Sequence, residues 1–380
     1  MSEFPPTDPL YPLFSIFAFF GFLLPLIPLT WHLQTWNSGA CFYMIWASLF
    51  GLINFVDSIV WAGRVLDVAP VWCDIAVHIY QAGCFAIPLS SLCIIRRLYL
   101  VASSKLVLTR LERRRAIIID TVLCLILPLV LLTLQYISQG HRYDIWEEIG
   151  CKWHMYITLT GVLLCNLPII TTGFISAIYA VFCIKALWRL LRKQNYNFIS
   201  TNASSRSFTS DRYIPIVALA ALEMTCTTPF AIFALIINIK QGLQPWISWD
   251  YVHSDFSYVG TVPSVIWKSN DVLKISLETE RWITASFGII IFLFLGTTKE
   301  ARKHYLRAFR RLGRLGGRRA TTVTPAGDES HDIPDYSMTE IAYSLPTVVD
   351  IHRESEMYFQ KNVVGDDSWP LFDITARNYI

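Results

Sequence analysis

The residues able to carry acid–base, nucleophilic or metal chemistry are few and scattered in this chain. Its eight histidines form no HxxxH or HExxH pair, the spacing that places two metal ligands on one helix face. Only His78 lies well inside an apolar segment, where a hydrogen bond within a helix bundle is favoured over metal ligation. No Ser/Lys dyad and no pair of carboxylates at helical spacing stands out there. We therefore expect no catalytic site, no metal site and no cofactor, which disfavours an enzyme.

Two carboxylates lie within long apolar segments, where charged groups are rare and usually functional. Asp57 and Glu223 would suit an ion pathway, so a proton-coupled transporter is the alternative function to test. Receptors also bury such groups, as conformational switches. Asp74 and Asp120 lie near segment ends, where water reaches them. A retinal-based pump is strongly disfavoured, because the last apolar segment contains no lysine for a Schiff base.

Composition indicates the kind of fold that must position these groups. Only 16% of the 380 residues are charged, against about 25% in soluble domains, while 53% are hydrophobic and mean hydropathy is +0.42. A membrane-spanning helix needs about 20 predominantly apolar residues. Seven such runs predict an all-α membrane protein, a seven-transmembrane helix bundle, with helices at about 12–33, 41–61, 72–99, 116–137, 156–187, 214–239 and 281–298.

Lysine and arginine set the direction in which the bundle threads the membrane. The loops after the third, fifth and seventh segments hold 22 basic residues, and the opposite loops hold 7. This asymmetry predicts an N-terminus outside and a C-terminus in the cytoplasm. Beyond a bundle domain over 1–298, residues 299–319 predict a short basic amphipathic helix on the cytoplasmic leaflet. Residues 320–380, with 11 acidic residues against 3 basic ones, predict a largely disordered tail.

Under this topology two of the nine cysteines face the oxidising side of the membrane. Cys73 lies at the outer end of the third segment, and Cys151 lies in the second outer loop. A disulfide between them would hold that loop over the mouth of the bundle, and two free thiols are the alternative. The other cysteines are expected to be small apolar packing residues within helices.

Prolines lie inside four of the apolar segments. Each removes a backbone hydrogen bond, so we expect helix kinks at these positions. Kinked helices beside a basic cytoplasmic mouth would suit a ligand-driven outward movement. The four positions are Pro88, Pro128, Pro168 and Pro229.

The second and third outer loops hold a dense mixture of aromatic and acidic residues. An interfacial aromatic belt explains some of them, such as Trp72, Trp153 and Trp282. It does not explain an outer loop of about 40 residues between the last two segments, since long loops are usually functional. An aromatic lid would suit an amphiphilic ligand, and the acids would suit a basic or peptide one.

Several motifs follow one another along the chain in a defined order. They are Leu26–His32, Trp72–Ile75, Cys93–Tyr99, His141–Ile145 with Glu148–Cys151, and Phe294–Ala301. In this order and spacing, over about residues 10–312, the chain resembles the fungal lipopeptide mating-pheromone receptors, the a-factor-type branch of class D G-protein-coupled receptors. One local departure is Arg212–Pro215, where the family tends to have Arg-Leu and no proline at the entry to the sixth segment.

The resemblance implies a multi-pass plasma-membrane receptor for a short secreted peptide whose C-terminal cysteine is farnesylated and methyl-esterified. Such a receptor activates a heterotrimeric G protein in mating signalling, which implies peptide, G-protein and membrane-lipid partners and no nucleic acid. The residues expected to bind the ligand are Asp74, His78, Asp144, Trp146, Glu148, Trp249, Asp255 and Trp267. Those expected to face the G protein are Arg96, Arg97, Arg113, Arg114, Arg189, Arg192 and Arg302, of which the first two would contact it or hold the inactive state.

Overall fold

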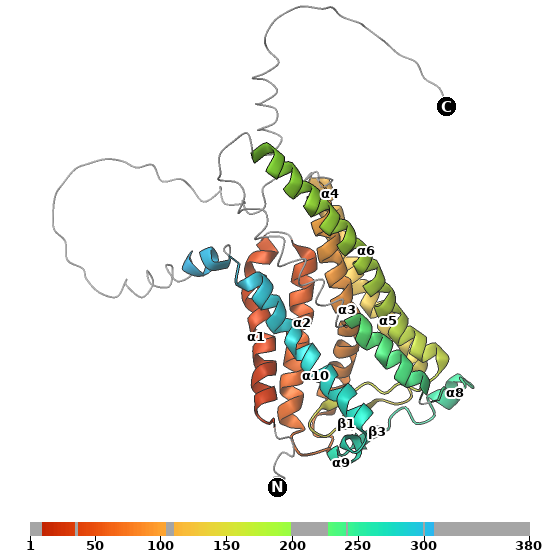
Figure 1. Ribbon diagram of the computed structural model, residues 1–380. Coiled ribbons are helices and arrows are strands. Elements are labelled where there is room, and N and C mark those ends of the chain that lie inside the picture. Colours follow the sequence, from red (N-terminus) through yellow and green to blue (C-terminus); the bar gives the residue numbers. More distant parts are fainter. Residues whose placement is uncertain are drawn as a thin grey trace, which may run out of the picture.

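The computed structural model describes residues 10–34, 37–103, 110–198, 227–240, 242–298 and 301–307. In this part of the chain, six helical spans are long and apolar enough to cross a membrane. They form a bundle of roughly aligned helices (Figure 1). The spans are α1 (Leu13–Gln34), α2 (Ser38–Val60), α3 (Pro70–Ala102), the run of α4 (Arg110–Thr121), η1 (Val122–Ile126), α5 (Leu127–Gln135) and η2 (Tyr136–Ser138), α6 (Leu159–Phe198), and α10 (Asp271–Ile291) with η3 (Phe292–Gly296).

The predicted sixth segment, 214–239, is described only in its second half. There the chain forms a shorter apolar helix, Thr227–Lys240. Residues 214–226, which include Glu223, lie outside the described residues, as do Arg212–Pro215.

The last helix begins at Asp271, well before the predicted start at residue 281. Asn270 caps it by accepting hydrogen bonds from the backbone N–H groups of Val272 and Leu273, at 3.1 and 3.2 Å. The first turns also carry Lys274, which lowers their hydropathy. A prediction based on apolar runs therefore placed the start too late.

Small residues allow α1, α2 and α10 to approach one another closely. A Cβ atom added at Gly51 would collide with the backbone nitrogen of Phe22, and one at Gly288 would collide with the carbonyl oxygen of Gly21. Such small-residue contacts are the usual basis of helix packing in membranes, where lipid is as apolar as the protein core. The main buried cluster lies beside this contact, between α2, α3 and α10.

The predicted helix-kink prolines occupy different settings. Pro88 and Pro168 lie inside α3 and α6, and Pro229 lies in the helix Thr227–Lys240. Pro128 is the second residue of α5, which follows η1, a single wide π-turn. Such a turn leaves backbone groups without their regular partners, and here the carbonyl of Cys124 in η1 accepts a hydrogen bond from Trp46 Nε1 at 3.0 Å.

A three-stranded sheet lies at the end of the bundle where α1 begins (Figure 1). Strands β1 (Tyr143–Trp146) and β2 (Gly150–Lys152) form an antiparallel hairpin between η2 and α6. Strand β3 (Val259–Val262) comes from the segment before α10 and pairs in parallel with β1. That segment also contains the short helices α8 (Trp249–Val252) and α9 (Ser264–Lys268). We call the hairpin segment, 139–158, together with 242–270 the lid.

At the opposite end of the bundle, residues 301–307 form a helix against the end of α1. The His304 ring stacks on Trp31 with centroids 5.3 Å apart, and the Tyr305 hydroxyl donates to the Gly296 carbonyl at 2.9 Å. The remainder of the predicted amphipathic helix, 299–300 and 308–319, and the predicted tail, 320–380, lie outside the described residues.

Candidate functional site

The lid is attached to the bundle by a disulfide between Cys73 in the first turn of α3 and Cys151 in β2, with Cα atoms 5.4 Å apart. Both cysteines are buried in a cluster that includes Trp61, Tyr143 and Ile145. Tyr143 and Ile145 reach it because alternate β1 side chains point toward the bundle. The hairpin is therefore fixed to α3 by a covalent bond inside an apolar core.

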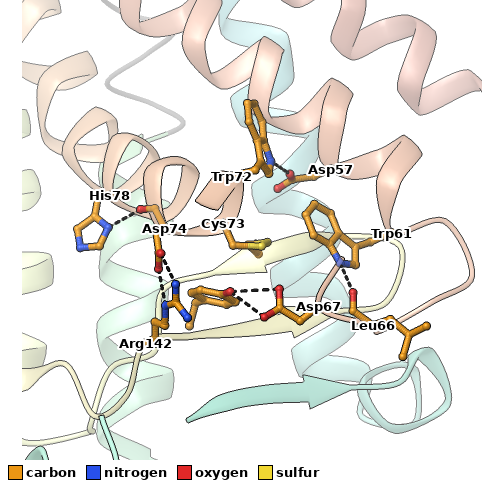
Figure 2. Close-up of a disulfide and its surroundings, with 11 residues drawn as sticks. Asp57, Trp61, Leu66, Asp67, Trp72, Cys73, Asp74, His78 and Arg142 are labelled. Carbon is orange, nitrogen blue, oxygen red and sulfur yellow. Dashed lines mark hydrogen bonds and ion pairs between the residues drawn. A yellow bond between two sulfur atoms is a disulfide. The ribbon is translucent and has the colours of Figure 1, made fainter. Parts of the chain in front are cut away.

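Two polar contacts beside the disulfide hold the same hairpin (Figure 2). Arg142 donates two hydrogen bonds to the Asp74 carboxylate, one of them from Nε at 2.7 Å, and this pairing raises the pKa of Arg142. The Tyr143 hydroxyl donates to the Asp67 carboxylate at 3.1 Å. Burial and the charge of Asp67 together raise the pKa of Tyr143 to about 12. Tyr143 therefore remains a hydrogen-bond donor throughout the physiological pH range.

Asp57 lies in the last turn of α2, directly beneath the hairpin, and is buried. Its Oδ1 accepts a hydrogen bond from Trp72 Nε1 at 2.7 Å (Figure 2). Gly150, with a φ of +102°, passes so close that a Cβ atom there would collide with the Asp57 side chain. Because α2 ends three residues beyond Asp57, this carboxylate lies at the lid end of the bundle and not in its middle, where an ion pathway would need it.

The tight turn between β1 and β2 connects the hairpin to α9 in the second segment of the lid. Glu148 has a φ of +70°, a left-handed conformation that costs a non-glycine residue about 1–2 kcal/mol. Its backbone N–H donates to the Trp61 carbonyl at 2.9 Å, and its buried carboxylate pairs with Lys268 of α9. These partners offset the cost and bind the turn to both α9 and the end of α2.

Arg281 of α10 lies between the bundle and the lid and is almost fully buried. Its guanidinium lies 4.6 Å from the Phe14 ring centroid, donates from Nε to Glu278 at 2.8 Å, and reaches the Glu148 carbonyl at 3.4 Å. A cavity of about 10 Å³ adjoins it, which holds at most one water molecule. Its lining residues are Tyr11, Phe14, Ser15, Ser58, Ala62, Glu148 and Arg281.

The residues expected to bind a ligand occupy separate parts of the lid and its base. His78 Nδ1 lies 2.6 Å from the Asp74 carbonyl oxygen, and its ring meets Trp153 edge-on at 5.4 Å. Trp267 is fully buried and donates from Nε1 to the Glu147 carbonyl, at 3.2 Å. Trp146 packs beside this residue. In the described structure the lid is thus closed over its own aromatic core.

The remaining third-loop candidates lie farther out. Trp249 is 46% exposed, and its ring stacks on His253 at 4.2 Å. His253 in turn contacts the Tyr136 carbonyl at 3.0 Å, which fixes α8 against the end of the α4–α5 span. Asp255 is exposed, and its carbonyl accepts from the Tyr258 backbone N–H at 3.0 Å. Trp249 is therefore an accessible aromatic surface at the edge of the lid.

One polar cluster was not anticipated from the sequence. The Asp144 carboxylate lies between two imidazoles, 2.7 Å from His141 Nε2 and 2.8 Å from His154 Nδ1. Burial raises the pKa of Asp144, but the hydrogen bonds and charge of His154 and His141 outweigh burial, so that its pKa is lowered overall. His141 and Asp144 are three residues apart, but His154 lies ten residues beyond Asp144, and the hairpin pairing brings it to the other two.

The expected G-protein-facing arginines all lie at the bundle end opposite the lid, which we call the basic end. Arg96 and Arg97 are half-buried at the end of α3. Asp120, which the sequence placed in contact with water, is instead buried, accepts a hydrogen bond from Ser38 and attracts Arg97 electrostatically. The other candidates at this end are exposed: Arg113, Arg114, Arg189, Arg192 and Arg302.

Comparison with known proteins adds independent information. Residues 13–313 match the family described as "Pheromone A receptor". The chain is 41% identical over 312 residues to the "Pheromone B alpha 1 receptor" of Schizophyllum commune, covering 82% of this chain and 48% of that protein. It is 31% identical to "Pheromone receptor 1" of Mycosarcoma maydis, covering 75% and 79%. It is 22% identical to the "Pheromone a factor receptor" of Saccharomyces cerevisiae, covering 74% and 58%.

The chain spans about half the length of the first of these curated relatives. The family match nevertheless covers α1 through the helix 301–307, and with it all the helices and strands described above. Several apolar helical spans in a receptor family indicate a multi-pass membrane protein. Proton-coupled transport through Asp57 and Glu223 finds no support in these matches. The chain belongs to the pheromone A receptor family.

Proposed function

We propose that this chain is a G-protein-coupled receptor for a secreted, farnesylated peptide mating pheromone, and that it acts at the plasma membrane of a fungal cell. The observation that carries the proposal is the polarity of the bundle. A disulfide-anchored, aromatic-rich lid lies at one end, and exposed arginines lie at the other. The names of the relatives, all fungal pheromone receptors, support the same assignment.

In this proposal the bundle has seven spans, the sixth of which consists of residues 214–226 together with the helix Thr227–Lys240. The lid faces outward with the N-terminus, and the basic end faces the cytoplasm, in keeping with the 22-to-7 asymmetry of basic residues. The segment 299–319 would lie as an amphipathic helix on the anionic inner leaflet, and 320–380 would form the acidic tail.

Ligand binding would use the lid and its base. Asp74, His78, Asp144, Trp146, Trp249 and Asp255 would contact the peptide or its prenyl chain. Glu148 and Trp267 are buried here, so they would reach the ligand only after the lid opens. The farnesyl chain suits aromatic walls because its transfer from water contributes about 25 cal/mol per Å² of apolar area buried.

The test is a pheromone-responsive reporter in yeast cells that express this chain and a matched G protein. The cells would be challenged with methyl-esterified peptides from compatible partners, each made with and without the farnesyl group. We expect activation only by the prenylated form. Equal activation by both forms would refute lipid recognition. Silence to every peptide, with surface expression and coupling verified, would refute the pheromone assignment.

The basic end offers a second prediction, for signalling without ligand. Asp120→Asn removes the charge that attracts Arg97 while leaving a hydrogen-bonding group for Ser38. If this contact holds the inactive state, a loss of about 1 kcal/mol would raise basal reporter activity about fivefold. Asp271→Asn, which removes an exposed carboxylate at the lid end of the bundle, is the matched control and should leave basal activity unchanged. A fall in surface expression with no basal rise would indicate a purely structural role for Asp120.

A further inference from the structure

We propose that His141, Asp144 and His154 form a binding site for a divalent transition-metal ion, of which Zn²⁺ is the best match, on the solvent-facing side of the lid. The inference does not depend on the pheromone assignment, because it concerns the chemistry of the hairpin alone. It also revises the expectation from the sequence that the chain holds no metal site.

The first argument is the separation of the ligand atoms. One ligand atom from each residue lies within 4.8 Å of the other two. Zinc binds imidazole nitrogen and carboxylate oxygen at about 2.0–2.2 Å, so two ligands on one tetrahedral ion lie about 3.4 Å apart. The nitrogens of His141 and His154 already contact different oxygens of Asp144. Small side-chain rotations would therefore bring all three ligands onto one ion.

The second argument is that the backbone holds these side chains in place. His141 precedes β1 and His154 follows β2, so the antiparallel pairing brings the two ends of the hairpin together. The imidazole rings are stacked, with centroids 3.6 Å apart and planes inclined by 22°. Across the parallel pair, Gly260 faces Asp144, and a Cβ atom there would collide with the carboxylate. Glycine at this position leaves room for the acidic side chain within the sheet.

The third argument concerns competing charges. Lys152 is paired with Asp144 across the hairpin, yet its Nζ lies 2.9 Å from Glu280. Arg142 is bound to Asp74 on the other side of the strand. The nearest cations of the hairpin are thus engaged elsewhere, and the Asp144 carboxylate faces the two imidazoles.

The fourth argument is access. The side chains of His141 and Asp144 are 14% exposed and that of His154 is 33% exposed, so an ion can reach them from solvent. Tyr258 packs edge-on against His141 at 5.1 Å and shields one side. Two histidines and one carboxylate would leave one coordination position for water, as in open zinc sites. The donor set favours zinc, copper or nickel over calcium or magnesium, which prefer oxygen ligands.

The experiment uses the full chain, purified through a tag without histidine and placed in lipid nanodiscs. Zn²⁺ affinity is measured by competition with a chromophoric chelator, and Co²⁺ provides an absorption spectrum of the site. We expect one ion per chain with micromolar or tighter affinity. His141→Ala and His154→Ala should each weaken binding by at least about 100-fold, since loss of a direct ligand costs more than the roughly 10- to 100-fold effect of changing a residue that only hydrogen-bonds a ligand. His253→Ala, which alters another lid histidine, should bind as the unmodified chain does.

A variant that replaces one metal ligand by another distinguishes loss of metal coordination from loss of folding. His154→Cys should retain zinc binding and add an intense cobalt–thiolate absorption band, which arises only if residue 154 is itself a ligand. The proposal is overturned if the two alanine variants bind as tightly as the unmodified chain, or if no binding occurs below about 100 µM zinc. A thiolate band in the unmodified chain would also overturn it, because the ion would then be held by cysteines.

Discussion

Arg281→Leu is expected to reduce the amount of folded protein at the cell surface at least tenfold. Arg281 is only 2% exposed, and its guanidinium is shared by the Phe14 ring, the Glu278 carboxylate and the Glu148 carbonyl. Leucine removes the positive charge and leaves these acceptors facing an apolar side chain. Loss of one partner of a buried ion pair costs about 3–5 kcal/mol, and the partial exposure of Glu278 places the cost near the lower end.

The measurement is surface immunolabelling together with the thermal unfolding midpoint of the solubilised protein. Arg281→Lys retains the charge but not the planar fork, so it should lie between the leucine variant and the unmodified chain. Lys274→Leu makes a similar change at an exposed position on the same helix and should have little effect. If Lys274→Leu lowered surface labelling and the unfolding midpoint as much as Arg281→Leu does, the buried contacts of Arg281 would not be the cause of the loss.

Loss of the Cys73–Cys151 disulfide is expected to abolish the response to pheromone. The bond closes a loop with a sequence separation of 78, for which the chain-entropy model gives about 4–5 kcal/mol. Cys73→Ser, Cys151→Ser and the double variant should be equally defective, because each removes the same bond. Cys84→Ser, at a cysteine without a disulfide, is the control. The readouts are surface labelling and the reporter response, and a double variant clearly worse than either single one would contradict a shared bond.

The membrane helices were the most predictable part of this protein. A run as long and as apolar as Leu13–Gln34 is typical of a helix in contact with lipid, so its position in the chain can be predicted from local composition alone. The start of α10 was not predictable in the same way. Its first turns carry charges that pair with the lid, such as Glu280 with Lys152, and a hydropathy pattern cannot distinguish these turns from a polar loop.

The lid was only partly predictable. Cys73 and Cys151 could be singled out from the side of the membrane on which they were expected, and aromatic residues marked the loops. The sheet could not be foreseen, because β1 is four residues long and its parallel partner β3 lies more than a hundred residues later. The same long-range pairing determines which tryptophans are buried, as Trp267 is, and which remain exposed, as Trp249 does.

The burial of Asp120 could not be predicted from the sequence either. Its position near a helix end suggested contact with water, yet Ser38, the first residue of α2, lies against it. Contacts between elements far apart in sequence decide the burial of such a residue, and local pattern does not record them. The cluster of His141, Asp144 and His154 was not predicted for the same reason.

The parallel pairing of β1 and β3 has a consequence for how recognition can diverge during evolution. The two strands are joined through backbone groups over Tyr143–Trp146 and Val259–Val262, so their pairing makes few demands on side-chain identity. Tyr143 and Ile145 point inward and must fit the core, whereas Asp144 and Trp146 alternate with them and are half-buried. In the proposed receptor, substitutions at these alternate positions would alter what the lid recognises while the hydrogen-bonded frame and its disulfide persist. A lid of this kind allows new specificities to arise without the loss of the fold.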